Sequence, residues 1–85
     1  MPKTLGLIAG NRTFPIHVAR AAKAQGYCVI AVGLKEETDP ALGKEVDQMH
    51  WVSFSEIGQV PDLLVKFRVH ELVLAGQIMP KRLMG

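Results

Sequence analysis

Four short runs rich in apolar residues recur along the chain, separated by polar or amphipathic segments. Three of the runs are almost wholly apolar, a pattern typical of strands buried on both faces of a parallel sheet: residues 4–9, 27–32 and 71–75. Polar and apolar residues are mixed in the remaining run, residues 48–53, which indicates an outer strand. The pattern therefore predicts four strands.

A helix is predicted between the first two strands. Ile16, Ala19 and Ala22 recur at helical spacing and would lie on one face. Pro15 suits the first helical residue, because its missing N–H would have no partner there, and Gly26 suits the helix end. We therefore expect a helix from Pro15 to just before Gly26.

A second helix is predicted between the third and fourth strands. It opens at Ser55-Glu56 and continues to about Phe67, and Pro61 indicates a break near residues 58–60. The polar segment after the second strand contains one short helical turn, around residues 41–44.

Strands and helices thus alternate, and no pair of strands is joined by a hairpin signal. Such alternation predicts a parallel sheet with right-handed crossovers and helices on both faces. We expect one three-layer α/β domain over residues 1–85, with a sheet of about four strands in the order 3-2-1-4. In such a sheet the ligand crevice lies beyond the carboxyl ends of the strands, here between the first and fourth.

Two loops are expected to meet at that crevice. Gly10, Asn11 and Arg12 follow the first strand and lead into a helix N-terminus, where free amides and the helix dipole favour phosphate. Ala75 and Gly76 end the fourth strand, and Lys81 follows shortly after. These six residues are the predicted ligand-binding residues, and the two glycine turns would present backbone amides to a diphosphate. The alternative is that Gly10 only turns the chain and that the cations are solvated.

The sequence lacks the motifs of several common kinds of site. Arg12 stands where a dinucleotide fingerprint requires glycine, and Gly33-Leu34-Lys35 stands where the ribose-binding acid would be, so we expect neither NAD nor FAD. The three histidines and the scattered acids have no metal-ligand or paired-carboxylate spacing, so no catalytic or metal residue is assigned. Trp51 is interpreted as a packing residue.

Composition changes this picture little. The chain has 85 residues, 48% of them hydrophobic and 21% charged, and a formal net charge of +2, which suits one small globular domain and gives no sign of nucleic-acid binding. The lone cysteine, Cys28, fits a reducing cytosol. No apolar stretch is long enough to cross a membrane, and the strand begins too early to leave room for a signal peptide.

The order of these motifs resembles the N-terminal domain of the LpxI-type UDP-2,3-diacylglucosamine pyrophosphatases. The segments that carry the likeness are Leu5-Gly6-Leu7-Ile8-Ala9-Gly10-Asn11, Phe14-Pro15, Gly26-Tyr27, Gly33-Leu34-Lys35, Asp39-Pro40, His50-Trp51-Val52-Ser53, Gly58, Leu72-Val73-Leu74-Ala75-Gly76 and Pro80-Lys81. The family commonly has glycine where Arg12 stands, and a second glycine or a lysine where Gln77 stands.

This resemblance implies a small Rossmann-like domain and a definite chemistry. Such enzymes hydrolyse UDP-2,3-diacylglucosamine to UMP and 2,3-diacylglucosamine 1-phosphate on the route to lipid A, and they use Mg²⁺. Their catalytic and metal-binding acids belong to a C-terminal domain, which we expect to be absent from this chain. The resemblance implies substrate contacts at Gly10, Asn11, Ala75 and Gly76, with Arg12 and Lys81 as neighbours.

We accordingly expect the substrate-binding part of this hydrolase, inactive by itself, and a chain cut inside a longer protein. Two alternatives stay open: a free-standing nucleotide-binding module without catalysis, and an interaction domain that docks through residues 78–84. Homo-oligomers are a further expected form. The expected location is the cytoplasm, with a peripheral position at the inner membrane open because the substrate carries acyl chains.

Overall fold

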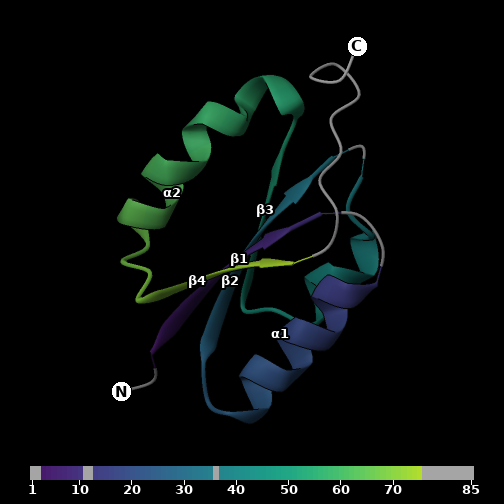
Figure 1. The fold of residues 1–85 in the computed structure, drawn as a ribbon, viewed down its shortest axis with the longest axis vertical. Coiled ribbons are helices and arrows are strands. Elements are labelled where there is room, and N and C mark those ends of the chain that lie inside the picture. The colour runs from purple at the N-terminus through teal and green to yellow at the C-terminus, as the bar shows by residue number, and fades with distance from the viewer. Residues whose placement is uncertain (1–2, 11–12, 36, 76–85) are drawn as a thin grey trace.

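The computed structural model describes residues 3–10, 13–35 and 37–75. Its elements follow the predicted alternation of strands and helices (Figure 1), and the short helical turn predicted around residues 41–44 is a segment of 3-10 helix, η1. In chain order they are β1 (Thr4–Ala9), α1 (Phe14–Ala24), β2 (Cys28–Leu34), η1 (Pro40–Lys44), β3 (Gln48–Val52), η2 (Phe54–Gln59), α2 (Val60–Lys66) and β4 (Glu71–Ala75).

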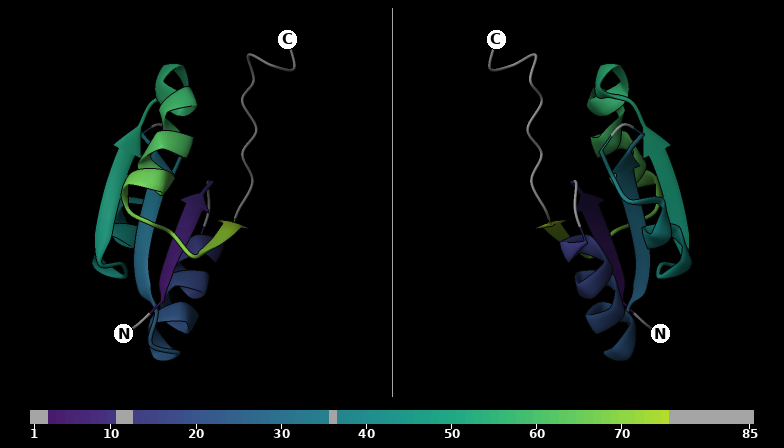
Figure 2. Two further views of the ribbon diagram at one scale, coloured as in Figure 1. Left: turned by 90° about the vertical axis from the view of Figure 1, so that its left-hand side faces the viewer. Right: turned by 90° about the vertical axis from the view of Figure 1, so that its right-hand side faces the viewer.

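The four strands form one parallel sheet in the order β3-β2-β1-β4, which confirms the predicted topology. Figure 2 shows the strands side by side in this order. Ala9, the last residue of β1, is paired with Gly33 of β2 on one side and with Ala75 of β4 on the other. The carboxyl ends of these three strands therefore meet at one rim, with the switch point between β1 and β4.

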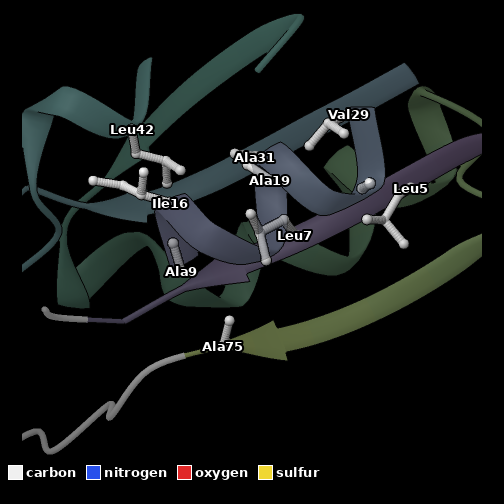
Figure 3. Close-up of a cluster of buried hydrophobic side chains, with 10 residues drawn as sticks. Leu5, Leu7, Ala9, Ile16, Ala19, Val29, Ala31, Leu42 and Ala75 are labelled. Carbon is white, nitrogen blue, oxygen red and sulfur yellow. The ribbon is translucent and has the colours of Figure 1, made fainter. Parts of the chain in front are cut away.

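The two helices lie on opposite faces of the sheet (Figure 1). The larger hydrophobic core lies between α1 and the sheet, where alternate strand residues point toward the helix (Figure 3). Its buried members are Leu5, Leu7, Ala9, Ile16, Ala19, Ala22, Val29, Ala31, Leu42 and Ala75. Ala9 and Ala75 lie at the rim end of this core, and Leu5 and Val29 lie at the other end (Figure 3).

The core on the α2 face is smaller. It joins Val32, Leu34, Val52 and Val60. The same face of β4 is not covered by described residues, and Leu72 and Leu74 are 51% and 68% exposed there. The sheet is thus well buried on one face and only partly buried on the other.

The second strand is longer than the sequence pattern predicts. It continues through Gly33 to Leu34 because β3 pairs with it up to Val52, and the Lys35 N–H donates to the Val52 carbonyl at 2.9 Å. Gly33, which the sequence pattern places after the strand, is therefore a residue of β2. Partner strands, which a local pattern does not reveal, decide where a strand ends.

The predicted second helix is divided in two, as Pro61 indicated. The 3-10 segment η2 ends at Gln59, and α2 begins at Val60. The start of η2 differs from the prediction by one or two residues, because Ser53 rather than Ser55 is its N-cap. Ser53 and Glu56 form a capping box, in which the Ser53 N–H donates to the Glu56 carboxylate at 2.9 Å.

Trp51, interpreted from the sequence as a packing residue, is 37% exposed and belongs to neither hydrophobic core. It lies on β3 at the edge of the sheet, and its side chain is on the face of the sheet that α1 covers. The α1 helix packs mainly on β1, β2 and β4, so it covers this edge strand less than the centre of the sheet. No helix in the described ranges is long and apolar enough to cross a membrane.

Candidate functional site

The predicted rim is formed by the ends of β1 and β4. The Gly10 N–H donates to the Ala75 carbonyl at 2.8 Å, which continues the ladder between the two strands by one residue. Gly10 and Ala75 are both buried. The structure therefore brings these two predicted site residues into direct contact. Their role in ligand binding stays a prediction.

This hydrogen bond also corrects one detail of the sequence-based expectation. Gly10 was expected to offer its amide to a phosphate, but that amide already has the Ala75 carbonyl as its partner. The contribution of Gly10 to a ligand site would instead be its missing side chain, which lets another group approach the backbone closely. Asn11, Arg12, Gly76 and Lys81, the other four predicted site residues, lie outside the described residues.

The N-terminus of α1 begins beside this rim. Thr13, the N-cap, makes no side-chain cap hydrogen bond, and the first turn contains no acidic residue. The positive end of the helix dipole is therefore not neutralised by the helix's own side chains, which favours an anion. Pro15 in the first turn has no N–H, so this helix offers an anion one backbone donor fewer than usual.

The β2 side of the rim carries a residue that the sequence analysis missed. Thr38 is 6% exposed, and within the described ranges it is the one polar side chain that is buried. Its hydroxyl accepts a hydrogen bond from the Leu34 N–H at 2.8 Å and donates one to the Ala9 carbonyl at 2.9 Å. A threonine in a polar loop gives no signal of such contacts, because both partners come from strands whose pairing is tertiary.

Two titratable side chains with shifted pKa values, Asp47 and Tyr27, lie near the amino end of the sheet. Their contacts stabilise the fold. The Asp47 carboxylate accepts hydrogen bonds from the Lys23 ammonium and the Val29 N–H, both at 2.7 Å, and these two donors lower the pKa of Asp47. The Tyr27 hydroxyl donates to Glu71, and this bond raises the pKa of Tyr27. Both groups join strand starts to neighbouring elements, far from the rim.

One titratable group lies nearer the carboxyl ends. The Glu56 carboxylate accepts from the Ser53 N–H and lies 3.7 Å from the Lys35 ammonium, and these contacts lower its pKa. Its partners are those of a helix cap and an exposed ion pair. We assign it a structural role.

His50 and His70 contact neighbouring elements of the fold. The His70 ring accepts from the Thr4 N–H through Nδ1 at 3.0 Å, and the backbone N–H of His70 donates to the Thr4 carbonyl at 2.9 Å. The His50 ring lies 4.7 Å from the Phe67 ring, centroid to centroid. Within the described part of the chain, no three His, Cys, Asp or Glu residues come together as a metal-binding group.

An open surface pocket of about 290 Å³ lies at the other end of the sheet. It is formed by the end of α2 and the start of β4, with Leu64, Arg68 and Glu71 among its lining residues. Ligands of open parallel sheets bind at the carboxyl ends of the strands, so we place the candidate site at the rim and not in this pocket.

A four-stranded parallel sheet between two helices, with its switch point between β1 and β4, defines a Rossmann-like α/β domain. The chain belongs to the LpxI N-terminal domain family, whose model matches residues 4–85. It is thereby related to LpxI, a UDP-diacylglucosamine pyrophosphatase of lipid A biosynthesis. No curated protein and no solved structure matches the chain.

Proposed function

We propose that this chain is the substrate-binding part of a UDP-2,3-diacylglucosamine pyrophosphatase, which releases UMP and 2,3-diacylglucosamine 1-phosphate. The observation that carries the proposal is the family match, because it extends over residues 4–85 and includes both loops of the rim. In this proposal the substrate's diphosphate lies at the switch point between β1 and β4, and its partners come from Gly10, Asn11, Arg12, Ala75, Gly76 and Lys81.

Three features of the rim support an anionic ligand. The peptide backbone at Gly10 and Ala75 is held in one place by their hydrogen bond. The start of α1 lacks acidic side chains, so its dipole and first-turn amides favour negative charge. Arg12 and Lys81 add permanent cations to the two loops in sequence, and a guanidinium can bind two phosphate oxygens at once.

The chemical step would come from elsewhere. Mg²⁺ in this family's reaction would lower the barrier by neutralising charge on the attacked phosphate. The residues described here do not fit such a cation, since no three of their acids and histidines come together. We therefore assign the metal ligands and the catalytic acids to a C-terminal domain. The part described here would position the substrate and shield it from water.

Titration of the chain with UDP, followed by backbone amide NMR, tests the proposal. We expect saturable shifts of amide resonances, including those of Gly10 and Ala75, that NAD at the same concentration does not produce.

Arg12→Ala should weaken UDP binding by about tenfold, since one charge-assisted contact is lost. Arg20→Ala is the matched control, because Arg20 pairs with Glu45 at 3.0 Å on the exposed side of α1 and should not change the affinity.

Activity measurements separate this proposal from its alternative. With UDP-2,3-diacylglucosamine and Mg²⁺, we expect binding to the 85-residue chain but no release of UMP. Release of UMP at enzymatic rates would contradict the assignment of catalysis to another domain. Binding of many nucleotides with equal affinity would instead favour a general nucleotide-binding module. The location that fits the proposal is the cytoplasmic side of the inner membrane, where the acylated substrate would be met.

A further inference from the structure

The peptide group between Ala9 and Gly10 is held at both of its polar ends. Its carbonyl oxygen, on Ala9, accepts a hydrogen bond from the Thr38 hydroxyl at 2.9 Å. Its N–H, on Gly10, donates to the Ala75 carbonyl at 2.8 Å. The first contact comes from the loop after β2 and the second from the end of β4. The plane of this peptide is therefore fixed between the two neighbours of β1.

The direction of the Thr38 hydroxyl follows from its partners. The Leu34 N–H can only donate, so the Thr38 oxygen accepts from it at 2.8 Å. The Ala9 carbonyl can only accept, so the single hydroxyl proton is directed to Ala9. The backbone of Thr38 is held as well, because its N–H donates to the Leu34 carbonyl at 2.9 Å. Thr38 thus joins the carboxyl ends of β1 and β2.

Gly33 leaves the space that Thr38 needs. A Cβ atom added at Gly33 would lie 3.0 Å from Cγ2 and 3.1 Å from Cβ of Thr38, and 2.6 Å from the end of the Met49 side chain. The methionine end can move, but Thr38 is held by three hydrogen bonds and cannot move away easily. A glycine at this place in β2 therefore lets the loop close over the strand end.

We propose that Thr38 is a positioning residue of the ligand-binding rim. By holding the Ala9–Gly10 peptide against Ala75, it fixes the backbone at the carboxyl end of β1. A nucleoside diphosphate at the switch point would contact the Ala9–Gly10 peptide, so its affinity depends on Thr38 although Thr38 does not touch it. This inference rests on the proposed function for its ligand, but the positioning of the peptide can be measured without one.

Three variants separate positioning from general stability. Thr38→Val keeps the shape and removes the hydroxyl, whereas Thr38→Ser keeps the hydroxyl and removes the methyl group. Val29→Ala is the matched control, because Val29 is fully buried in β2, the strand that leads to the Thr38 loop, but lies at the far end of the core (Figure 3). If Thr38→Val does not fold, Thr38→Ala replaces it. The smaller side chain leaves room for water to reach the Leu34 N–H and the Ala9 carbonyl.

The first measurement is amide hydrogen exchange of Gly10 in the ligand-free chain, relative to the exchange of core amides in the same variant. We expect exchange at Gly10 to become about tenfold faster in Thr38→Val, the effect of losing one buried hydrogen bond, and to stay near the wild-type rate in Thr38→Ser and Val29→Ala. An unchanged relative rate at Gly10 in Thr38→Val would overturn the inference.

The second measurement is the affinity for UDP at a temperature at which every variant is folded. Thr38→Val should bind about tenfold more weakly than wild type, while Thr38→Ser and Val29→Ala should bind within about twofold. Equal weakening by Val29→Ala would show a general loss of stability and would refute a positioning role. If the wild-type chain binds no UDP, the proposed function fails and the ligand role of Thr38 fails with it, while the Gly10 exchange still reports on the peptide.

Discussion

At the scale of single residues, the side chains that connect elements are polar and their partners are distant in sequence. Asp47 shows this most fully. Its carboxylate binds the Lys23 ammonium and the Val29 N–H, and its own N–H donates to the Val29 carbonyl. One residue thus starts the pairing of β3 with β2 and holds the end of α1 to them. Such a residue should contribute to stability through its charge.

Asp47→Asn tests this contribution and its pH dependence. Because Lys23 and the Val29 N–H favour the carboxylate, the pKa of Asp47 is below its unfolded value, so its contribution is present above about pH 4 and is lost as the pH falls through the folded pKa. We expect Asp47→Asn to lower the free energy of unfolding by about 1 kcal/mol at pH 7. Urea denaturation at pH 7, 5 and 3.5 should show this difference shrinking at the lowest pH.

The exposed ion pair of Arg20 and Glu45 provides the control for Asp47. Glu45→Gln removes a charge of the same sign two residues away, but it leaves the β2–β3 junction intact. We expect little effect on stability at any of the three pH values. A loss that is equal for both variants would indicate that net charge, not the contacts of Asp47, is responsible.

At the scale of elements, α1 packs closely on the sheet because its buried face is made of small residues. Ala19 and Ala22 face the core beside Ile16, and Ala19 has no exposed surface. Alanine lets the helix backbone approach β1, and β1 contributes Ala9 as a further small residue of the same core. The rim depends on this packing, since α1 begins at Phe14, four residues after Gly10. A larger residue at the interface should therefore displace the helix.

Ala19→Leu should lower the free energy of unfolding by about 1–3 kcal/mol, because three extra carbon atoms do not fit between α1 and β1 without movement. Ala21→Leu is the matched control, since Ala21 is exposed on the same helix and the same atoms would extend into solvent. Thermal or urea denaturation of both variants measures the effect. Equal stability of the two variants would show that the α1 interface is not closely packed.

At the scale of the whole molecule, the two faces of the sheet are unequally covered. The core under α2 joins residues of β1, β2 and β3, and Leu72 and Leu74 of β4 remain exposed on that side. Exposed leucines on one face of an outer strand are a common site of association between sheets. Homo-oligomers, expected from the sequence, would most readily form through this surface.

Leu74→Lys tests that route. We expect the wild-type chain to show a rising mean mass in sedimentation velocity over a tenfold concentration range, and Leu74→Lys to reduce this rise without loss of stability. Val65→Lys is the matched control, because Val65 is 78% exposed on α2 and not on the strand. If Val65→Lys reduced association as strongly, the effect would come from added charge and not from β4.

The sequence by itself determined the element order, the parallel sheet and its 3-2-1-4 topology. Apolar runs of strand length that alternate with helical spacing leave few ways to bury both faces, and right-handed crossovers reduce them further. The family followed from the order of its motifs, and the match over residues 4–85 confirms it. Only tertiary structure decided that β2 continues through Gly33, that Trp51 is exposed, and that the Gly10 amide is bonded to Ala75.

The reason for this division is physical. Local pattern reports whether a residue prefers burial, but a hydrogen bond between segments depends on which strands become neighbours and in what register. Thr38 and Ala9 are 29 residues apart, and their contact exists because the loop after β2 closes over the end of β1. The sequence could therefore place the rim at the ends of β1 and β4, while the fold alone showed that Thr38 and Ala75 hold the peptide between Ala9 and Gly10.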